Sequence, residues 1–125
     1  MSHEKLNVDI PGIDSNKGLS LCDGDMDIYL NSLRLCVSNM PATLEKMRHV
    51  TEATLHDYTI CVHGAKGICS YIGAEEARAL GKDLEDKARG GDLAGVLANN
   101  EAFLKIAGTL VENIRSWLLK NKLGT

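Results

Sequence analysis

Aromatic residues and prolines are scarce in this chain of 125 residues: aromatics make up 4% of it, and only two prolines are present. The core must therefore be built mainly from Leu, Ile, Val, Ala, Met and Cys, a mixture that suits packed helices. No segment alternates apolar and polar residues in the way a half-buried strand does. These absences predict an all-α protein.

The chain also lacks an excess of positive charge. Its formal net charge is −3 and it has no long run of Lys or Arg, so the electrostatic footprint for binding DNA or RNA phosphates is missing. No window approaches the ~20 apolar residues that span a bilayer, and residues 1–14 are polar, without the apolar core of a signal peptide. We therefore expect a soluble, cytoplasmic protein with no nucleic acid and no membrane among its partners.

Cysteine pairs of the C-x-x-C type are absent as well. In a chain without a signal peptide, isolated cysteines are expected to be reduced thiols that pack as small apolar side chains. A disulfide framework or a metal site is not expected from the four that are present: Cys22, Cys36, Cys61 and Cys69.

The length favours a single domain. We expect an N-terminal arm over residues 1–13, a helical domain over residues 14–121 and a C-terminal tail over residues 122–125. Asp14 can cap a short helix that ends near Leu21, because the residues that follow favour a turn.

A second helix is predicted from apolar residues that recur at intervals of three and four between Asp25, a possible N-cap, and Met40. Pro41 interrupts this pattern. Since proline is accepted in the first turn of a helix but not in its interior, a new, shorter helix is predicted to begin at Pro41, with Leu44 and Met47 turned inward.

The clearest helical pattern of the chain covers residues 54–72, and Gly73 follows it as a left-handed stop. The next helix ends at Gly90 and Gly91, and Asp92 caps a long final helix. Short connections between amphipathic helices make sequence neighbours pack antiparallel. The predicted fold is thus an up-and-down antiparallel four-helix bundle with one or two additional short helices.

Helical spacing also predicts which side chains face solvent and which face the core. In the next-to-last helix, the pairs Asp83/Lys87 and Glu85/Arg89 have the i,i+4 spacing of surface ion pairs, and we expect both on its exposed face. In the final helix, Leu97 is expected to face the core.

One face of the helix over residues 54–72 carries His63 among residues that are polar or lack a side chain. With about 100° of rotation per residue, Lys66 and Gly67 share that face, whereas the packing stripe begins near Val62 and is rotated away from it. A glycine inside a helix costs about 1 kcal/mol relative to alanine and needs an explanation. Here it removes bulk beside the imidazole, although it could also permit close helix packing, and an exposed histidine could simply be solvated.

The chemistry of this face fits the acceptance of a phosphoryl group. A neutral imidazole is a nucleophile near neutral pH when it is accessible. The ammonium of Lys66 can neutralise a phosphoryl group, which carries nearly two negative charges.

Two short runs resemble the H-x-x-K-G…G-A signature of histidine-containing phosphotransfer (HPt) domains: His63-Gly64-Ala65-Lys66-Gly67 and Ile72-Gly73-Ala74. The resemblance covers about residues 12–119. It implies that His63 is phosphorylated, that Lys66 is the charge partner of the phosphate and that Gly67 provides clearance for the imidazole. A few neighbours depart from the residues that are usual in the family: Val62, Ile68, Cys69 and Ala77.

The resemblance further implies a phosphorelay protein that accepts a phosphoryl group on His63 and passes it to or from a receiver-domain aspartate. Its expected partners are response-regulator receiver domains and a sensor or hybrid histidine kinase. Mg²⁺ is expected on the receiver domain, with no cofactor and no metal in this chain. The sequence has no G-x-x-x-x-G-K-[ST] loop and no Gly-rich kinase lid, so we expect no ATP-dependent kinase activity of its own. A monomer is expected, because no extra apolar helix face is evident.

Three other functions stay open on the sequence. The chain could be the phosphoacceptor module of a chemotaxis-type histidine kinase, which receives phosphate directly from an ATP-binding domain. It could be a non-catalytic helical adaptor in which His63 is incidental. A metal or redox protein using His56, His63, Cys61 and Cys69 is disfavoured, because both cysteines point roughly 120° or more away from the histidines on an ideal helix.

Overall fold

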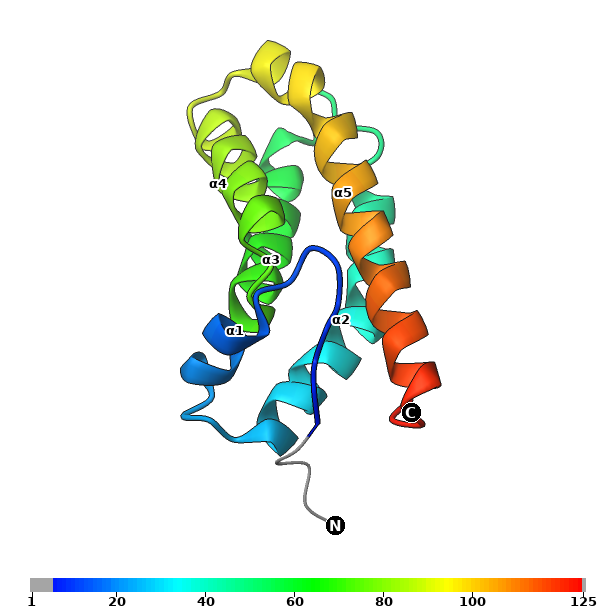
Figure 1. The fold of residues 1–125 in the computed structure, drawn as a ribbon. Coiled ribbons are helices and arrows are strands. Elements are labelled where there is room, and N and C mark those ends of the chain that lie inside the picture. Colours follow the sequence, from blue (N-terminus) through cyan, green and yellow to red (C-terminus); the bar gives the residue numbers. More distant parts are fainter. Residues whose placement is uncertain (1–5, 125) are drawn as a thin grey trace.

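The computed structural model describes residues 6–124, and these fold into α-helices without any β-strand (Figure 1). The all-α prediction is confirmed. Among residues 6–124, no helix combines the length and the apolar composition that a bilayer-spanning helix needs. The elements are α1 (Ser15–Leu21), α2 (Met26–Lys46), α3 (Leu55–Ile72), α4 (Glu75–Arg89) and α5 (Leu93–Lys120).

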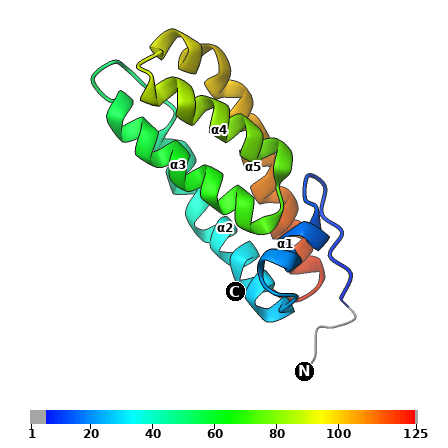
Figure 2. The same cartoon turned by 90° about the vertical axis from the view of Figure 1, so that its left-hand side faces the viewer.

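The four longer helices enclose one hydrophobic core. Leu97 of α5 is not part of it: its side chain is exposed, and the expectation that it faces the core is wrong. Helix α3 packs against α2 and α4, and α5 packs against the same two helices, so that each longer helix has two neighbours. The short helix α1 lies against α2 and α3. Figure 2 shows α3 and α4 side by side on the surface that faces the viewer.

Three aspartates begin their helices as the sequence predicts. The side chain of Asp14 accepts a hydrogen bond from a backbone N–H of α1, Asp25 accepts two from α2, and Asp92 accepts one from α5. Each cap satisfies N–H groups that have no partner within the helix. At the other end of α3, Gly73 adopts a left-handed φ of 83° as predicted.

Pro41 does not end a helix. Helix α2 continues through it to Lys46, and the predicted break is wrong. The buried stripe keeps its phase on both sides of the proline, with Met40 before it and Leu44 after it in the core, and Pro41 itself is exposed. Packing of this stripe outweighs the penalty of about 3 kcal/mol for a proline inside a helix.

The N-terminal arm is not loose where the structure describes it. Val8 and Ile10 are buried in the core, at 7% and 3% exposure, because they cover apolar side chains that the helices leave open. The C-terminal tail is also held, since Arg34 Nε donates a 2.9 Å hydrogen bond to the carbonyl of Leu123. Residues 1–5 of the arm and Thr125 of the tail lie outside the described residues.

A buried polar network ties α3 to its neighbours. The hydroxyl of Tyr58 donates to Asn100 Oδ1 at 2.8 Å, and Asn100 Nδ2 donates to the carbonyl of Met47 at 2.8 Å. Buried polar groups that are fully paired make a core rigid. Helix α3 is therefore fixed to α5 and to the end of α2 on the side that faces the core.

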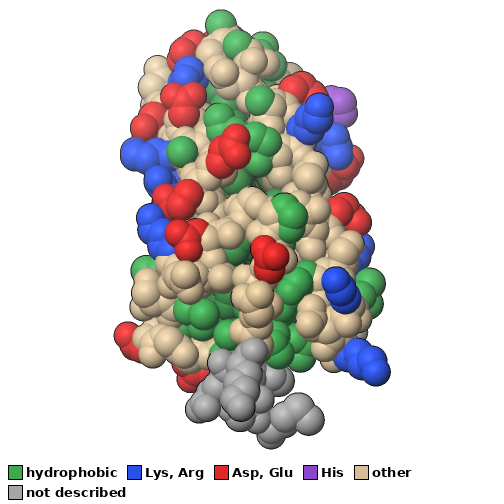
Figure 3. Space-filling model, viewed as in Figure 1, with side chains coloured by type: hydrophobic (Ala, Val, Ile, Leu, Met, Phe, Trp, Pro, Cys, Tyr) green, Lys and Arg blue, Asp and Glu red, His purple; other side chains and the backbone are tan. Residues whose placement is uncertain are grey.

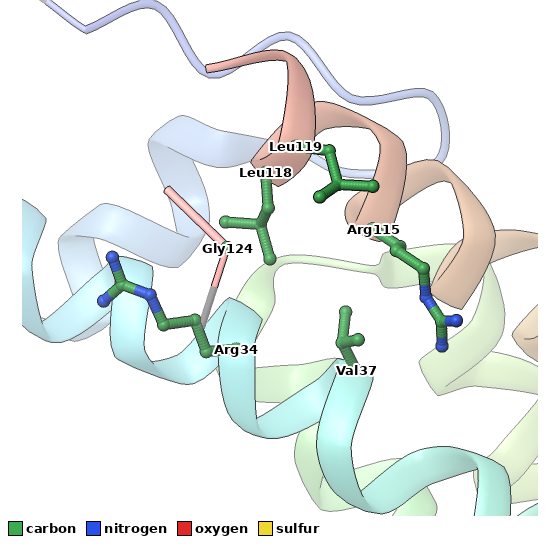
Figure 4. Close-up of a pocket in the computed structure, with 6 residues that line it drawn as sticks. All are labelled: Arg34, Val37, Arg115, Leu118, Leu119 and Gly124. Atoms are coloured by element: carbon green, nitrogen blue, oxygen red, sulfur yellow. The ribbon is translucent and has the colours of Figure 1, made fainter. Parts of the chain in front are cut away.

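A pocket lies between α2 and α5 near the C-terminal end of the chain, as Figure 4 shows. Apolar side chains and two arginines line it, and none of its lining residues belongs to the site described below: Arg34, Val37, Arg115, Leu118, Leu119 and Gly124.

Candidate functional site

The imidazole of His63 projects from α3 into solvent. Its side chain is 60% exposed, whereas its neighbours Val62 and Ala65 are fully buried. The helix is thus anchored by one face and presents His63 on the other. His63 faces solvent, as expected from the sequence.

A buried carboxylate holds one edge of this ring. Glu85 of α4 has a side chain that is only 5% exposed, and the distance between its Oε2 and His63 Nδ1 is 2.6 Å. The expectation that Glu85 lies on the exposed face of its helix is therefore wrong. It faces α3, where cations from both helices compensate the loss of water around its charge.

Those cations are Lys66 and Arg89. Lys66 Nζ donates to Glu85 Oε1 at 2.7 Å, and Arg89 donates to Glu85 Oε2 through Nη2 at 2.7 Å and through Nε at 3.2 Å. Burial raises the pKa of Glu85, but the hydrogen bonds from Lys66, Arg89 and His63 outweigh it and lower the pKa to about 2. Glu85 is therefore ionised across the physiological range.

The ionised carboxylate determines the tautomer of His63. A carboxylate only accepts hydrogen bonds, so Nδ1 must carry the proton and donate it to Glu85. Nε2 of the neutral ring then holds the lone pair. Within residues 6–124, no group forms a hydrogen bond with Nε2, and this nitrogen lies on the side of the ring away from Glu85.

Close packing of α4 on α3 brings Glu85 to the ring. A Cβ added to Gly81 would lie 3.3 Å from Lys66 Cβ and 3.2 Å from an edge carbon of Phe103, which is tighter than ordinary contact. The missing side chain lets the two helices approach at this point. Glu85, one turn further along α4, is thereby within reach of both Lys66 and His63.

Mixed charges continue along the rest of α4. Acidic and basic side chains are intermingled down the edge of the molecule that this helix forms (Figure 3). The exposed pairs Lys82/Asp86 and Lys87/Asp83 account for part of this pattern. The Asp83/Lys87 pair is exposed as predicted, and such surface pairs contribute little. Glu85 differs from them in being buried.

The opposite side of His63 has little bulk. At about 100° per residue, the positions on this side carry two glycines between two exposed apolar side chains, Ile60 at 61% and Tyr71 at 66% exposure. A Cβ added to Gly64 or to Gly67 would meet nothing within 4 Å. We call Lys66, Glu85 and Arg89 the charged side of His63, and Ile60, Gly64, Gly67 and Tyr71 its open side.

A groove runs from His63 toward the N-terminal end of α3, between α3 and the C-terminal end of α4. The imidazole forms one end of the groove, and the side chain of Arg89 lines it, whereas Lys66 does not. Its other lining residues are Leu55, His56, Thr59, Ile60, Ala88 and Gly91.

The structure brings together the three residues singled out by sequence, His63, Lys66 and Gly67, and adds Glu85 and Arg89. The histidines and cysteines weighed as metal ligands do not form a cluster: within residues 6–124, no group of three or more His, Cys, Asp or Glu is arranged to hold a metal ion. Cys69 is fully buried, and its burial raises the pKa of its thiol to about 12.

Comparison of the chain with models of protein families, with curated proteins and with solved structures gives no significant match.

Proposed function

We propose that this chain is a histidine phosphotransfer protein, which accepts a phosphoryl group on His63 and passes it to or from a receiver-domain aspartate in a two-component phosphorelay. One observation carries the proposal. The exposed ring of His63 is held through Nδ1 by the buried, ionised carboxylate of Glu85, so that Nε2, which carries the lone pair in the neutral ring, faces solvent.

In the transfer step, these groups account for the bonds that form and break and for the charge that develops. Nε2 attacks the phosphorus of an aspartyl phosphate, the N–P bond forms as the P–O bond to the aspartyl oxygen breaks, and the electron pair leaves with the aspartate carboxylate. The ring keeps its Nδ1 proton and becomes cationic. Glu85, hydrogen-bonded to that proton, offsets the new charge. Transfer to a second receiver reverses the step.

In this proposal Gly67 keeps the clearance role expected from the sequence, and Lys66 contributes to the positive charge near the ring. The ammonium of Lys66 adds positive charge beside the ring, and the open space at Gly67 allows a partner's backbone to approach it. The divalent cation expected in the reaction belongs to the receiver domain.

The scaffold we propose is the up-and-down antiparallel bundle of α2, α3, α4 and α5, with α1 as the additional short helix. Contacts of each long helix with two neighbours support it. A monomeric state and a cytoplasmic location stay predictions, as do the receiver and kinase partners.

Two alternatives differ from this proposal in their experimental signature. A phosphoacceptor module of a chemotaxis-type kinase would take phosphate from a kinase domain with ATP and not from a phosphorylated receiver. A helical adaptor would take phosphate from neither.

The test is incubation of the purified chain with phosphorylated receiver domains, and separately with histidine kinase and ATP, followed by detection of acid-labile phosphate. The expected product is phosphohistidine in the wild type and in a His49→Gln control, and none in His63→Gln. His49 is an exposed histidine of the loop between α2 and α3. Acid-labile phosphate on the His63→Gln variant, or none on the wild type with every donor, would refute the proposal.

A further inference from the structure

Two cations contact Glu85, and they differ in exposure and in position. The side chain of Lys66 is 23% exposed and binds Oε1, whereas that of Arg89 is 58% exposed and binds Oε2, the oxygen that also accepts from His63. Nη2 of Arg89 therefore lies within about two hydrogen-bond lengths of His63 Nδ1, the ring nitrogen that faces Glu85. Arg89, unlike Lys66, also lines the groove that ends at His63.

Arg89 keeps donors free for a second acceptor. A guanidinium has five N–H groups, and Arg89 uses only one from Nε and one from Nη2 for Glu85. No group within residues 6–124 accepts a hydrogen bond from its Nη1. Planar, forked donors of this kind match the oxygens of a phosphoryl group better than a single ammonium does.

From this geometry we infer that Arg89 binds the phosphoryl group carried on His63 Nε2, in the groove between α3 and α4, and that Lys66 acts chiefly by holding Glu85 in place. The inference rests on the proposed function and deepens it. It differs from the sequence-based expectation, in which Lys66 is the charge partner of the phosphate.

A double-mutant cycle separates a phosphate contact from a purely structural role. If Arg89 acts only by holding Glu85, Arg89→Ala has no further effect once Glu85 has been replaced by Gln. If Arg89 binds the phosphoryl oxygens, Arg89→Ala slows phosphorylation by about tenfold in the wild-type background and in the Glu85→Gln background alike.

The measurement is the rate of phosphohistidine formation on the full chain with phosphoramidate as donor, followed by ³¹P NMR. This small donor needs no protein partner: the donor P–N bond breaks, the His63 N–P bond forms, and ammonia leaves. Arg89→Lys should recover part of the rate. Arg78→Ala is the matched control, because Arg78 lies on the same helix, pairs with Glu75, and is about 16 Å from Arg89 along the helix axis; its rate should stay within twofold of the wild type.

NMR chemical shifts give a direct readout of the contact, in addition to the rates. In the wild type, the ¹⁵N resonance of Arg89 Nε should shift on phosphorylation, and the ³¹P resonance of phospho-His63 should shift in Arg89→Ala but not in Arg78→Ala. A wild type that accepts phosphate while Arg89→Ala has no effect in the Glu85→Gln background would overturn the role of Arg89 and leave the proposed function standing. A wild type that accepts phosphate from no donor would overturn both.

Discussion

The two sides of His63 differ in whether their groups have partners within the chain. On the charged side, Glu85 is already paired with Lys66, Arg89 and the ring itself, and each of these contacts lies within one chain. On the open side, a Cβ added at Gly64 or Gly67 would meet nothing within 4 Å from the rest of the described chain.

Under the proposed function, this contrast separates chemistry from recognition. The charged side sets the tautomer of His63 and the charge around it whether or not a partner is present. The open side has no packing role in the isolated chain, although two glycines within α3 lower helix stability by about 1 kcal/mol each. We infer that the open side serves a protein partner and the charged side serves the reaction itself.

The largest effect is expected from filling the open side. Gly67→Leu should slow transfer from a phosphorylated receiver by about 100-fold or more, because the leucine would stand beside the imidazole where the partner's backbone approaches. Phosphorylation by phosphoramidate should stay within about twofold of the wild type. Rates with the two donors, measured on the same preparation, test this.

Gly108→Leu is the matched control for that variant. Gly108 is also inside a helix with nothing within 4 Å of an added Cβ, but it belongs to α5. This control should leave both rates unchanged. Equal losses with both donors in Gly67→Leu would show that the leucine disturbs His63 itself, and the separation of the two sides would fail.

Replacing the carboxylate should affect both donors equally. Glu85→Gln keeps the shape of the side chain but removes the charge that offsets the cationic ring, so transfer should fall by about 30-fold with a receiver and with phosphoramidate. The ratio of the two rates is the decisive measurement. A loss confined to the receiver reaction would mean that Glu85 contributes to docking.

The open side could be predicted from sequence because it is local. Gly67 lies four residues after His63 on the same helix, and the rotation of about 100° per residue is enough to place the two on one face. The starts of α1, α2 and α5 could be predicted for the same reason, since Asp14, Asp25 and Asp92 act on the N–H groups that follow them.

Of the charged side, only Lys66 could be predicted in this way, because Glu85 lies 22 residues after His63 on another helix. Its i,i+4 spacing to Arg89 is equally typical of a surface pair. A signal was present in Gly81, a glycine inside a polar helix, which marks close approach to Lys66. The prediction of a helix break at Pro41 failed for a related reason. Local propensity favours a break there, but packing of α2 on the core overrides it.

Acid should weaken the charged side and leave the open side unaffected. Because the folded-state pKa of Glu85 is lowered from 4.5 to about 2, its contribution to stability is complete above pH 4.5 and is lost as the pH falls through about 2. Between pH 7 and pH 3 the wild type should lose about 2 kcal/mol more of its free energy of unfolding than Glu85→Gln does. Urea unfolding of both proteins at the two pH values measures this, and parallel losses would contradict the lowered pKa.

The smallest expected effect is a gain in stability on the open side. Gly64→Ala adds one methyl group where nothing lies within 4 Å, so it should raise the free energy of unfolding by about 0.5–1 kcal/mol through helix propensity alone. Gly108→Ala should give the same gain, since that site is equally open. Only Gly64→Ala should also slow transfer from a phosphorylated receiver, by a few-fold, because only this methyl group lies where a partner docks. Urea unfolding and receiver kinetics, measured on both variants, test this prediction. If Gly64→Ala stabilises the fold and transfers phosphate as fast as Gly108→Ala, Gly64 does not serve a partner. The open side is then confined to the immediate surroundings of Gly67.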